Sequence, residues 1–149
     1  MYNENGLSPN CLVSHISNRS QAELHNKTLE WINVVSKSQN ILIKSNIETD
    51  FISFMGVKEN FLNEGKLYLH MKYVIKVSFK NGQYKFEPLE IASKVNSKYD
   101  MGWKSVNLKN GSDFFKKGKA IKKTKSYVKK VPEALNNINN ILYNYLTTH

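Results

Sequence analysis

The longest regular pattern in the chain is an alternation of apolar and polar positions from Leu67 to Phe79. Every odd-numbered position in this segment is apolar, and most even-numbered positions are polar or amphipathic. A period of two is typical of an antiparallel strand with one face on a core and the other toward solvent. Asn81-Gly82 follows, a pair that favours a two-residue type I′ turn. Tyr84 and Phe86 then resume the apolar face, so the pattern predicts one long hairpin.

The turn fixes which residues of the hairpin face one another. Lys76 is expected opposite Glu87, as a cross-strand ion pair worth about 0.2–1 kcal/mol. The alternation breaks at Pro88, and proline within a sheet belongs at an edge or a bulge. A one-residue bulge restores the apolar match. The pairs predicted on the two sides of the bulge are Phe79 with Tyr84, Val77 with Phe86, Leu89 with Ile75, and Ile91 with Tyr73.

Two helices and several shorter strands are predicted around the hairpin. Ser20 and Glu23 fit a capping box, and apolar residues at helical spacing follow, so we expect a helix over residues 21–36. A second helix is expected to begin at Pro132, because proline is favoured in a first helical turn. The shorter strands are predicted at residues 11–16, 40–45, 47–57 and 103–108, with a turn over 60–66.

This order of elements predicts one α+β domain over residues 1–149, a curved antiparallel sheet with two helices on one face. Residues 1–10 are expected to form a flexible tail, and residues 96–130 a long lysine-rich connection. The open face of the sheet is a candidate surface for a ligand, a protein partner or a second copy of the chain. The alternative is that residues 96–130 cover it, with Trp103 packed on the sheet. The candidate residues of this face are Tyr68, His70, Lys72 and Val74.

Three segments and the closing amphipathic helix resemble the bacterial domain-of-unknown-function 4468 family. The segments are Leu-Glu-Trp-Ile at 29–32, Met-Lys-Tyr-Val-Ile-Lys-Val at 71–77 and Lys-Asn-Gly-Gln-Tyr-Lys-Phe at 80–86. The resemblance implies a TATA-binding-protein-like fold and brings no catalytic residues. The family usually has aspartate and arginine where this chain has Asn81 and Gln83. Its members commonly begin with an export signal, which implies an exported or periplasmic protein if a signal has been removed, and otherwise a cytoplasmic one.

The formal net charge of +10 is unevenly distributed. Eight lysines and no acidic residue lie between Lys116 and Lys130, and Arg19 is the only arginine of 22 basic residues. Lysine acts as a point charge, without the planar fork that arginine offers to phosphates and bases. We therefore expect weak, non-specific binding of polyanions, with non-specific nucleic-acid binding as the alternative function because aromatic residues lie nearby. The candidate polyanion patch consists of Lys116, Lys117, Lys119, Lys122, Lys123 and Lys125.

No motif for catalysis, metal binding or cofactor binding is recognisable. The four histidines are scattered, Cys11 lacks a nucleophile signature, and the seven glycines form no phosphate-binding loop. The nearest carboxylate pairs fall in predicted turns and exposed strand ends, where they are solvated. No apolar run is long enough to span a membrane. The sequence therefore predicts a non-enzymatic binding or accessory domain of the bacterial envelope, without cofactor or metal; an enzyme with no recognisable motif is the other alternative.

Overall fold

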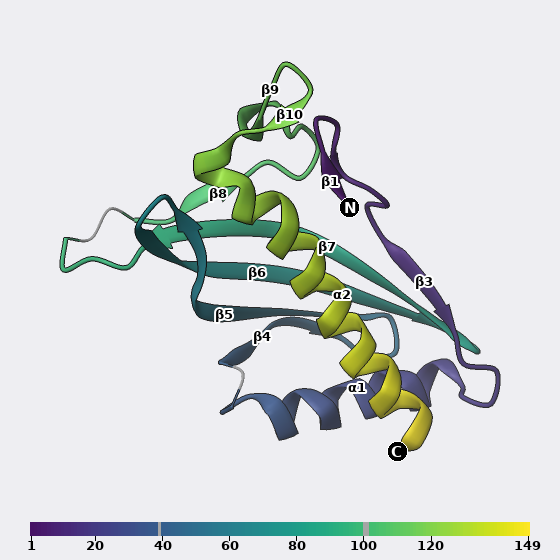
Figure 1. Cartoon of the computed structure of the whole chain (residues 1–149). Helices are drawn as coiled ribbons and strands as arrows, with labels where there is room; N and C mark the ends of the chain where they lie inside the picture. The colour runs from purple at the N-terminus through teal and green to yellow at the C-terminus, as the bar shows by residue number, and fades with distance from the viewer. Residues whose placement is uncertain (39, 100–101) are drawn as a thin grey trace.

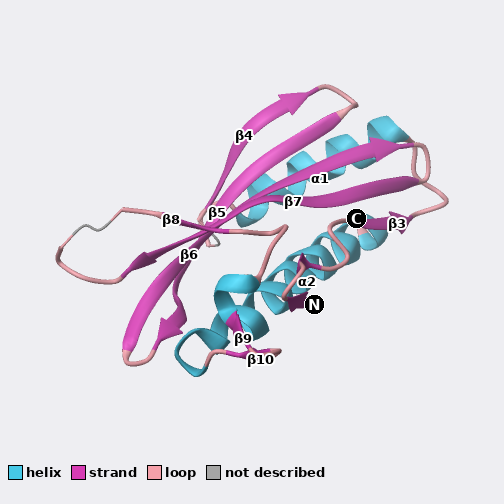
Figure 2. Ribbon diagram, turned by 90° about the horizontal axis from the view of Figure 1, so that it is seen from above, coloured by secondary structure: helices cyan, strands magenta, loops and turns pink. Residues whose placement is uncertain are grey.

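The computed structural model describes residues 1–38, 40–99 and 102–149. Its main sheet has six antiparallel strands in the order β3-β7-β6-β5-β4, with β8 also paired to β7. The strands are β3 (Leu12–His15), β4 (Ile41–Ile47), β5 (Phe51–Glu64), β6 (Leu67–Lys80), β7 (Gln83–Val95) and β8 (Lys104–Val106), and the helices are α1 (Gln21–Val35) and α2 (Lys125–Thr148). Both helices pack on one face of the twisted sheet (Figures 1 and 2), as an α+β fold requires.

The core lies between the two helices and the odd-numbered side chains of β6. Trp31 of α1 meets Phe54 edge to face at 5.7 Å, and the Tyr84 hydroxyl donates to Asn139 of α2 at 2.8 Å. Gly56 lies on the same face, where a Cβ would collide with the Tyr73 hydroxyl, so only glycine leaves room for that ring. The fully buried side chains of β6 are Met71, Tyr73, Ile75 and Val77.

Helix α1 begins with the predicted capping box. The Glu23 N–H donates to the Ser20 hydroxyl at 3.2 Å, and the Ser20 N–H donates to the Glu23 carboxylate at 3.3 Å. Two of the otherwise unpaired N–H groups of a helix start are thereby satisfied. The helix ends at Val35, one residue before the predicted end.

The β6–β7 hairpin turns at Asn81 and Gly82 as predicted, but the turn is of a different type. Among the described residues of this loop, the positive φ falls on Gly82 alone, at 75°. A type I′ turn needs positive φ at both positions, whereas a type II turn needs it only at the second. The chain before α1 explains the difference, since the Gln21 N–H donates to the Asn81 side chain at 2.9 Å and the Gly82 N–H donates to the Arg19 carbonyl at 2.8 Å.

The bulge in β7 is present, one residue away from its predicted place. Tyr73 faces Ile91 as expected, but Ile75 faces Pro88, and Leu89 is the extra residue. Pro88 has no N–H to give to the ladder, so it can occupy a paired position only where the ladder is already broken. Leu89 is consequently half exposed, at 50%, and does not contribute to the core.

The predicted ion pair between Lys76 and Glu87 is wrong, although the two residues face each other in the register. The Glu87 carboxylate lies 4.0 Å from the Lys85 ammonium group on its own strand. The Lys76 ammonium group instead lies 4.5 Å from the centre of the Phe51 ring on β5. A cation over an aromatic face gains about 0.5–1 kcal/mol, which is comparable with an exposed ion pair.

Strands β4 and β5 extend beyond their predicted ends. β4 continues to Ile47, the turn lies at residues 48–50, and β5 runs from Phe51 through most of the region expected to be a turn. The alternation of apolar and polar residues did not reveal that β5 is continuous, because the strand carries a bulge between Lys58 and Leu62, with Asn60 at φ 51°. A bulge of this kind interrupts the alternation without ending the strand. The actual turn is at residues 65–66.

Residues 1–10 are not a flexible tail. They form a short hairpin of β1 (Tyr2–Asn3) and β2 (Gly6–Leu7). Tyr2 is buried, and its hydroxyl donates to the Asn107 carbonyl at 2.6 Å. The buried Tyr2 ring and the main-chain hydrogen bonds from Leu7 N–H to the Leu108 carbonyl and from Gly111 N–H to the Glu4 carbonyl hold this segment in place.

The connection expected over residues 96–130 is shorter and contains several short elements. Residues 100–101 lie outside the described residues. Beside β8 it holds η1 (Ser112–Phe114), β9 (Phe115–Lys116), β10 (Lys119–Ala120) and η2 (Lys122–Thr124). α2 already begins at Lys125, so Pro132 lies inside the helix rather than at its first turn. The buried Tyr127 and Val131 extend the apolar stripe of α2 toward its start, and this packing stabilises the added turns.

Candidate functional site

A groove of about 850 Å³ opens beside the N-terminal end of α2. The β5–β6 turn forms one wall, and η2 with the first turns of α2 forms the other. Figure 1 shows the start of α2 in the upper part of the molecule, near the β5–β6 turn. The residues that line the groove are Asn63, Gly65, Ala120, Lys122, Lys123, Lys125, Ser126, Val128, Lys129 and Lys130.

Hydrogen bonds hold the two walls of the groove together. The Gly65 N–H donates to the Lys123 carbonyl at 3.2 Å. The Ser126 hydroxyl accepts from the Asn63 N–H at 3.1 Å and donates to the Asn63 carbonyl at 2.8 Å. Asn63 and Ser126 are 63 positions apart in sequence, so the groove is shaped by the tertiary fold rather than by a local loop. A site with fixed walls loses little conformational entropy when a ligand binds.

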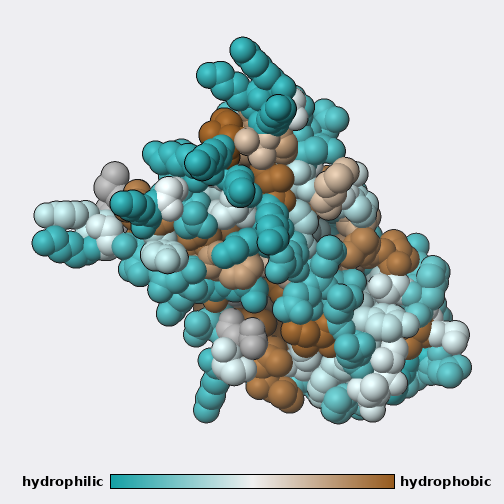
Figure 3. Space-filling view, viewed as in Figure 1, coloured by the Kyte–Doolittle hydropathy of each residue, from teal (hydrophilic) through white to brown (hydrophobic). Residues whose placement is uncertain are grey.

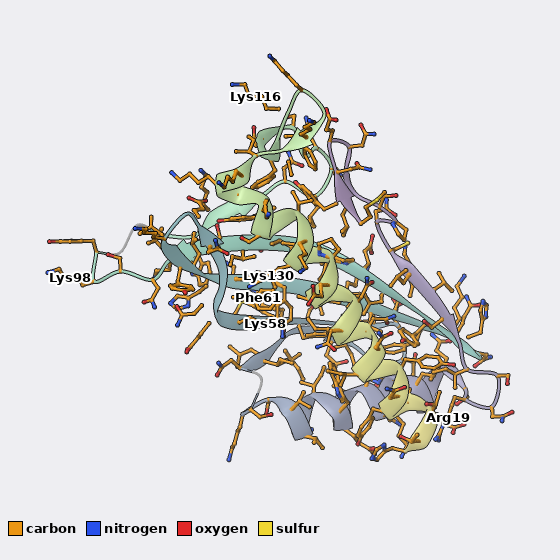
Figure 4. The ribbon with its side chains drawn as sticks, viewed as in Figure 1. Arg19, Lys58, Phe61, Lys98, Lys116 and Lys130 are labelled. Carbon is orange, nitrogen blue, oxygen red and sulfur yellow. The ribbon has the colours of Figure 1, made fainter. Side chains whose placement is uncertain are left out.

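Five cationic side chains line the groove. Among the described residues, none of the salt bridges involves Lys122, Lys123, Lys125, Lys129 or Lys130. The Lys130 ammonium group donates to the Phe61 carbonyl at 3.1 Å and lies 5.4 Å from the Phe61 ring centre, with Lys58 at 5.5 Å from the same ring (Figure 4). Five like charges without carboxylate partners repel one another, and a bound anion relieves that repulsion.

Glu64, the acidic residue at the β5–β6 turn, forms a hydrogen bond with Tyr127 rather than an ion pair with a groove lysine. Glu64 accepts a hydrogen bond from the Tyr127 hydroxyl at 3.0 Å, and the same hydroxyl lies 3.1 Å from the Ser93 hydroxyl. Burial raises the pKa of Tyr127 to about 12, so the phenol remains a neutral donor at physiological pH. Glu64 is therefore engaged with Tyr127, whereas Lys122, Lys123, Lys125 and Lys129 are exposed.

The structure divides the predicted polyanion patch into two parts. Lys122, Lys123 and Lys125 line the groove, whereas the remaining three lysines are exposed on the β9–β10 hairpin, at the top of Figure 4. The patch omitted Lys129 and Lys130, because the helix was expected to begin only at Pro132. Their helical spacing from Lys125 and Ser126 is the signal that could have identified them. The three hairpin residues are Lys116, Lys117 and Lys119.

The aromatic residues near the lysines are engaged in packing. The rings of Phe114 and Tyr127 are stacked with their centres 5.0 Å apart, and Tyr2 meets Phe114 edge to face. Trp103 lies elsewhere, with the ammonium group of Lys72 5.1 Å from its ring centre. Among the described residues that line the groove there is charge and apolar surface but no aromatic ring on which a base could stack.

The predicted surface on the other face of the sheet is only partly open. Tyr68 is 63% exposed, whereas Val74 is buried. His70 accepts from the Asn60 N–H at 3.1 Å through Nδ1, and Lys72 lies 3.6 Å from the carboxylate of Glu90. Of the four candidate residues, Tyr68 thus contributes most to the accessible surface. Binding of a ligand, a partner or a second copy at this face stays a prediction.

Neither a metal-binding cluster nor a membrane-spanning helix is found among the described residues. No three of their histidine, cysteine, aspartate and glutamate side chains are grouped so that they could hold a metal ion. Over the same residues, none of the helices is both long enough and apolar enough to cross a membrane.

Comparisons with known proteins bear on the fold. No family model and no curated protein matches the sequence. A crystal structure of a DUF4468 family protein from Bacteroides ovatus ATCC 8483 superposes with a TM-score of 0.73 at 13% identity, over 93% of this chain and 85% of that chain. A TBP-like protein from Parabacteroides distasonis ATCC 8503 gives a TM-score of 0.67 at 18% identity, over 97% of each chain. The fold is TATA-binding-protein-like.

The expected structural resemblance to the domain-of-unknown-function 4468 family is thereby confirmed. A TBP-like fold does not imply that the protein binds DNA, because folds are shared among unrelated functions. The feature of this chain that bears on its function is the lysine-lined groove.

Proposed function

We propose that this protein is a non-catalytic binding domain that holds an anionic ligand in the lysine-lined groove. The observation that carries the proposal is a preformed groove of about 850 Å³ lined by five lysines, none of which forms a salt bridge with a carboxylate of the described residues. This volume falls in the range of ordinary ligand pockets. An action at the bacterial envelope, where anionic lipids and polymers are abundant, is part of the proposal.

The absence of arginine in the groove bears on the kind of recognition. An ammonium group attracts any phosphate or carboxylate, but it does not impose the bidentate geometry that distinguishes one acceptor from another. The groove is therefore suited to recognising charge density, and the ligand should be selected by charge and length rather than by sequence. Within the groove nucleic acid would bind through its phosphates, since the nearby rings of Phe114 and Tyr127 are stacked on each other and the exposed rings of Tyr68 and Tyr99 lie outside its lining.

The test is calorimetric titration with inorganic polyphosphate. Replacing Lys122, Lys125 and Lys129 by glutamine should weaken binding on the order of a hundredfold, at about 1 kcal/mol per lysine. The matched control replaces Lys37, Lys44 and Lys80, which are exposed and lie outside the groove. Both variants lose the same net charge, so equal losses of affinity would refute a groove-specific site. Single-stranded oligonucleotides of different sequence should bind alike and lose affinity as salt rises.

A further inference from the structure

One end of the molecule combines the groove lysines with exposed apolar side chains. The β5–β6 turn, residues 96–99 after β7, and the β9–β10 hairpin lie at this end in both ribbon views (Figures 1 and 2). In Figure 4 Lys98 and Lys116 mark its two tips. We call these three segments, together with the groove, the lysine-rich end. In Figure 3 its two tips are mainly hydrophilic, with hydrophobic residues showing beside them.

Three large apolar or aromatic side chains are exposed at the lysine-rich end. Leu67 is 52% exposed, Tyr68 63% and Tyr99 68%. Leu67 and Tyr68 directly follow the turn that forms one wall of the groove, and they pair with Glu64 and Asn63 respectively across the hairpin. Successive strand residues point to opposite faces, so Leu67 lies on the face of the helices and Tyr68 on the other face, and the two side chains flank the tip of the hairpin. An inorganic polyanion such as polyphosphate gains nothing from contact with such side chains. A surface that is both anionic and apolar beneath its charges would contact the lysines and these side chains at once.

We propose that the lysine-rich end docks on the surface of an anionic lipid bilayer. The lysines contact lipid phosphates, and Leu67 and Tyr68 enter the boundary between headgroups and acyl chains. The inference rests on the proposed function, since the groove lysines are the cations that bind the phosphates. Lysine side chains suit this role because their aliphatic stems lie along apolar material while the ammonium group stays at the headgroups. Tyrosine is likewise favoured at the membrane–water boundary.

The charge distribution favours one orientation on such a surface. The end of the molecule opposite the lysine-rich end carries Arg19, which is labelled in Figure 4 and lies 3.6 Å from the Glu23 carboxylate. A cation paired in this way attracts an anionic surface less than an unpaired one does. Eight lysines without an intervening acid lie between Lys116 and Lys130. The cluster of eight lysines outweighs the exposed Lys80 and the paired Arg19 at the opposite end, so the attraction is strongest at the lysine-rich end.

The test is co-sedimentation with vesicles of phosphatidylcholine that contain about one quarter phosphatidylglycerol, against vesicles of phosphatidylcholine alone. The protein should sediment only with the anionic vesicles. Replacing both Leu67 and Tyr68 by serine should weaken this binding about tenfold or more, because apolar burial is lost, and should leave polyphosphate binding unchanged. The matched control replaces Val34 and Leu89 by serine, two side chains that are 68% and 50% exposed on other elements.

A second readout reports insertion directly. In a Tyr68→Trp variant, anionic vesicles should shift the added tryptophan emission to shorter wavelength, and polyphosphate should not. Vesicle binding that is insensitive to Leu67 and Tyr68, or absent while polyphosphate still binds, would overturn the docking proposal and leave the proposed function standing. Failure of both ligands to bind would overturn both.

Discussion

The Ser126 hydroxyl is hydrogen bonded to both main-chain groups of Asn63. It accepts from the N–H at 3.1 Å and donates to the C=O at 2.8 Å. Through this one side chain the first turn of α2 is tied to the end of β5. The lysines of the helix are thereby held against the β5–β6 turn, which makes the groove a feature of the folded protein.

Replacing Ser126 by alanine should destabilise the protein and weaken its affinity for polyphosphate. Two partly buried main-chain groups would lose their partner, at a cost of about 1–3 kcal/mol. Urea unfolding measures the first effect and calorimetry the second. Ser38→Ala is the control, because Ser38 is exposed and its hydroxyl makes only a long bond within its own turn, at 3.4 Å. Unchanged stability of Ser126→Ala would show that the bond does not hold the wall.

Replacing Gly82 by valine should lower the melting temperature by several degrees. The φ of 75° is unfavourable for a β-branched residue, at a cost of about 1–3 kcal/mol. No neighbouring atom obstructs the added side chain, since the nearest lies 3.8 Å from the Cβ position. The loss would therefore report backbone strain alone. Gly82→Asn should cost less, because asparagine tolerates this region. A valine variant that melts like the wild type would refute the turn assignment.

Stability should fall as the pH rises above 10. Burial raises the pKa of Tyr73, Tyr84 and Tyr127 from 10.0 to about 12. Between these values the unfolded chain releases protons that the folded chain keeps, so the contribution of these groups is complete below pH 10 and is lost toward pH 12. Urea titrations on the two sides of pH 10 measure the fall, and Tyr127→Phe should reduce it. A stability that is constant across this range would contradict the burial of the phenols.

The sequence predicted the parts of the fold that depend on local patterns. The capping box at Ser20 and the alternation through β6 led to α1 and to the hairpin register near the turn, because both signals are contained in a few consecutive residues. The elements defined by long-range packing were missed. Tyr2 draws the N-terminus into the core, and Tyr127 extends α2, through contacts that no local pattern reveals.

The candidate site was half predictable for the same reason. The lysine cluster was visible as composition, and three of its predicted members line the groove. The groove itself depends on Asn63 and Gly65, which are far from the lysine cluster in the sequence. Lys129 and Lys130 join it only because the helix starts at Lys125. The lysine cluster is visible in the sequence, but the β5–β6 turn that forms the opposite wall of the groove is found only in the structure.

The central claim is that anions bind in the lysine-lined groove, and the most direct test is to map where on the protein an anion binds. Titration with inorganic polyphosphate, followed by ¹H–¹⁵N correlation spectra, should shift the amide signals that line the groove first and most. Gly65 and Ser126 are the marker residues, because they belong to opposite walls and carry no charge themselves. Gly82, at the far end of the β6–β7 hairpin, should not shift. Shifts spread over all exposed lysines, or concentrated away from Gly65 and Ser126, would contradict the account.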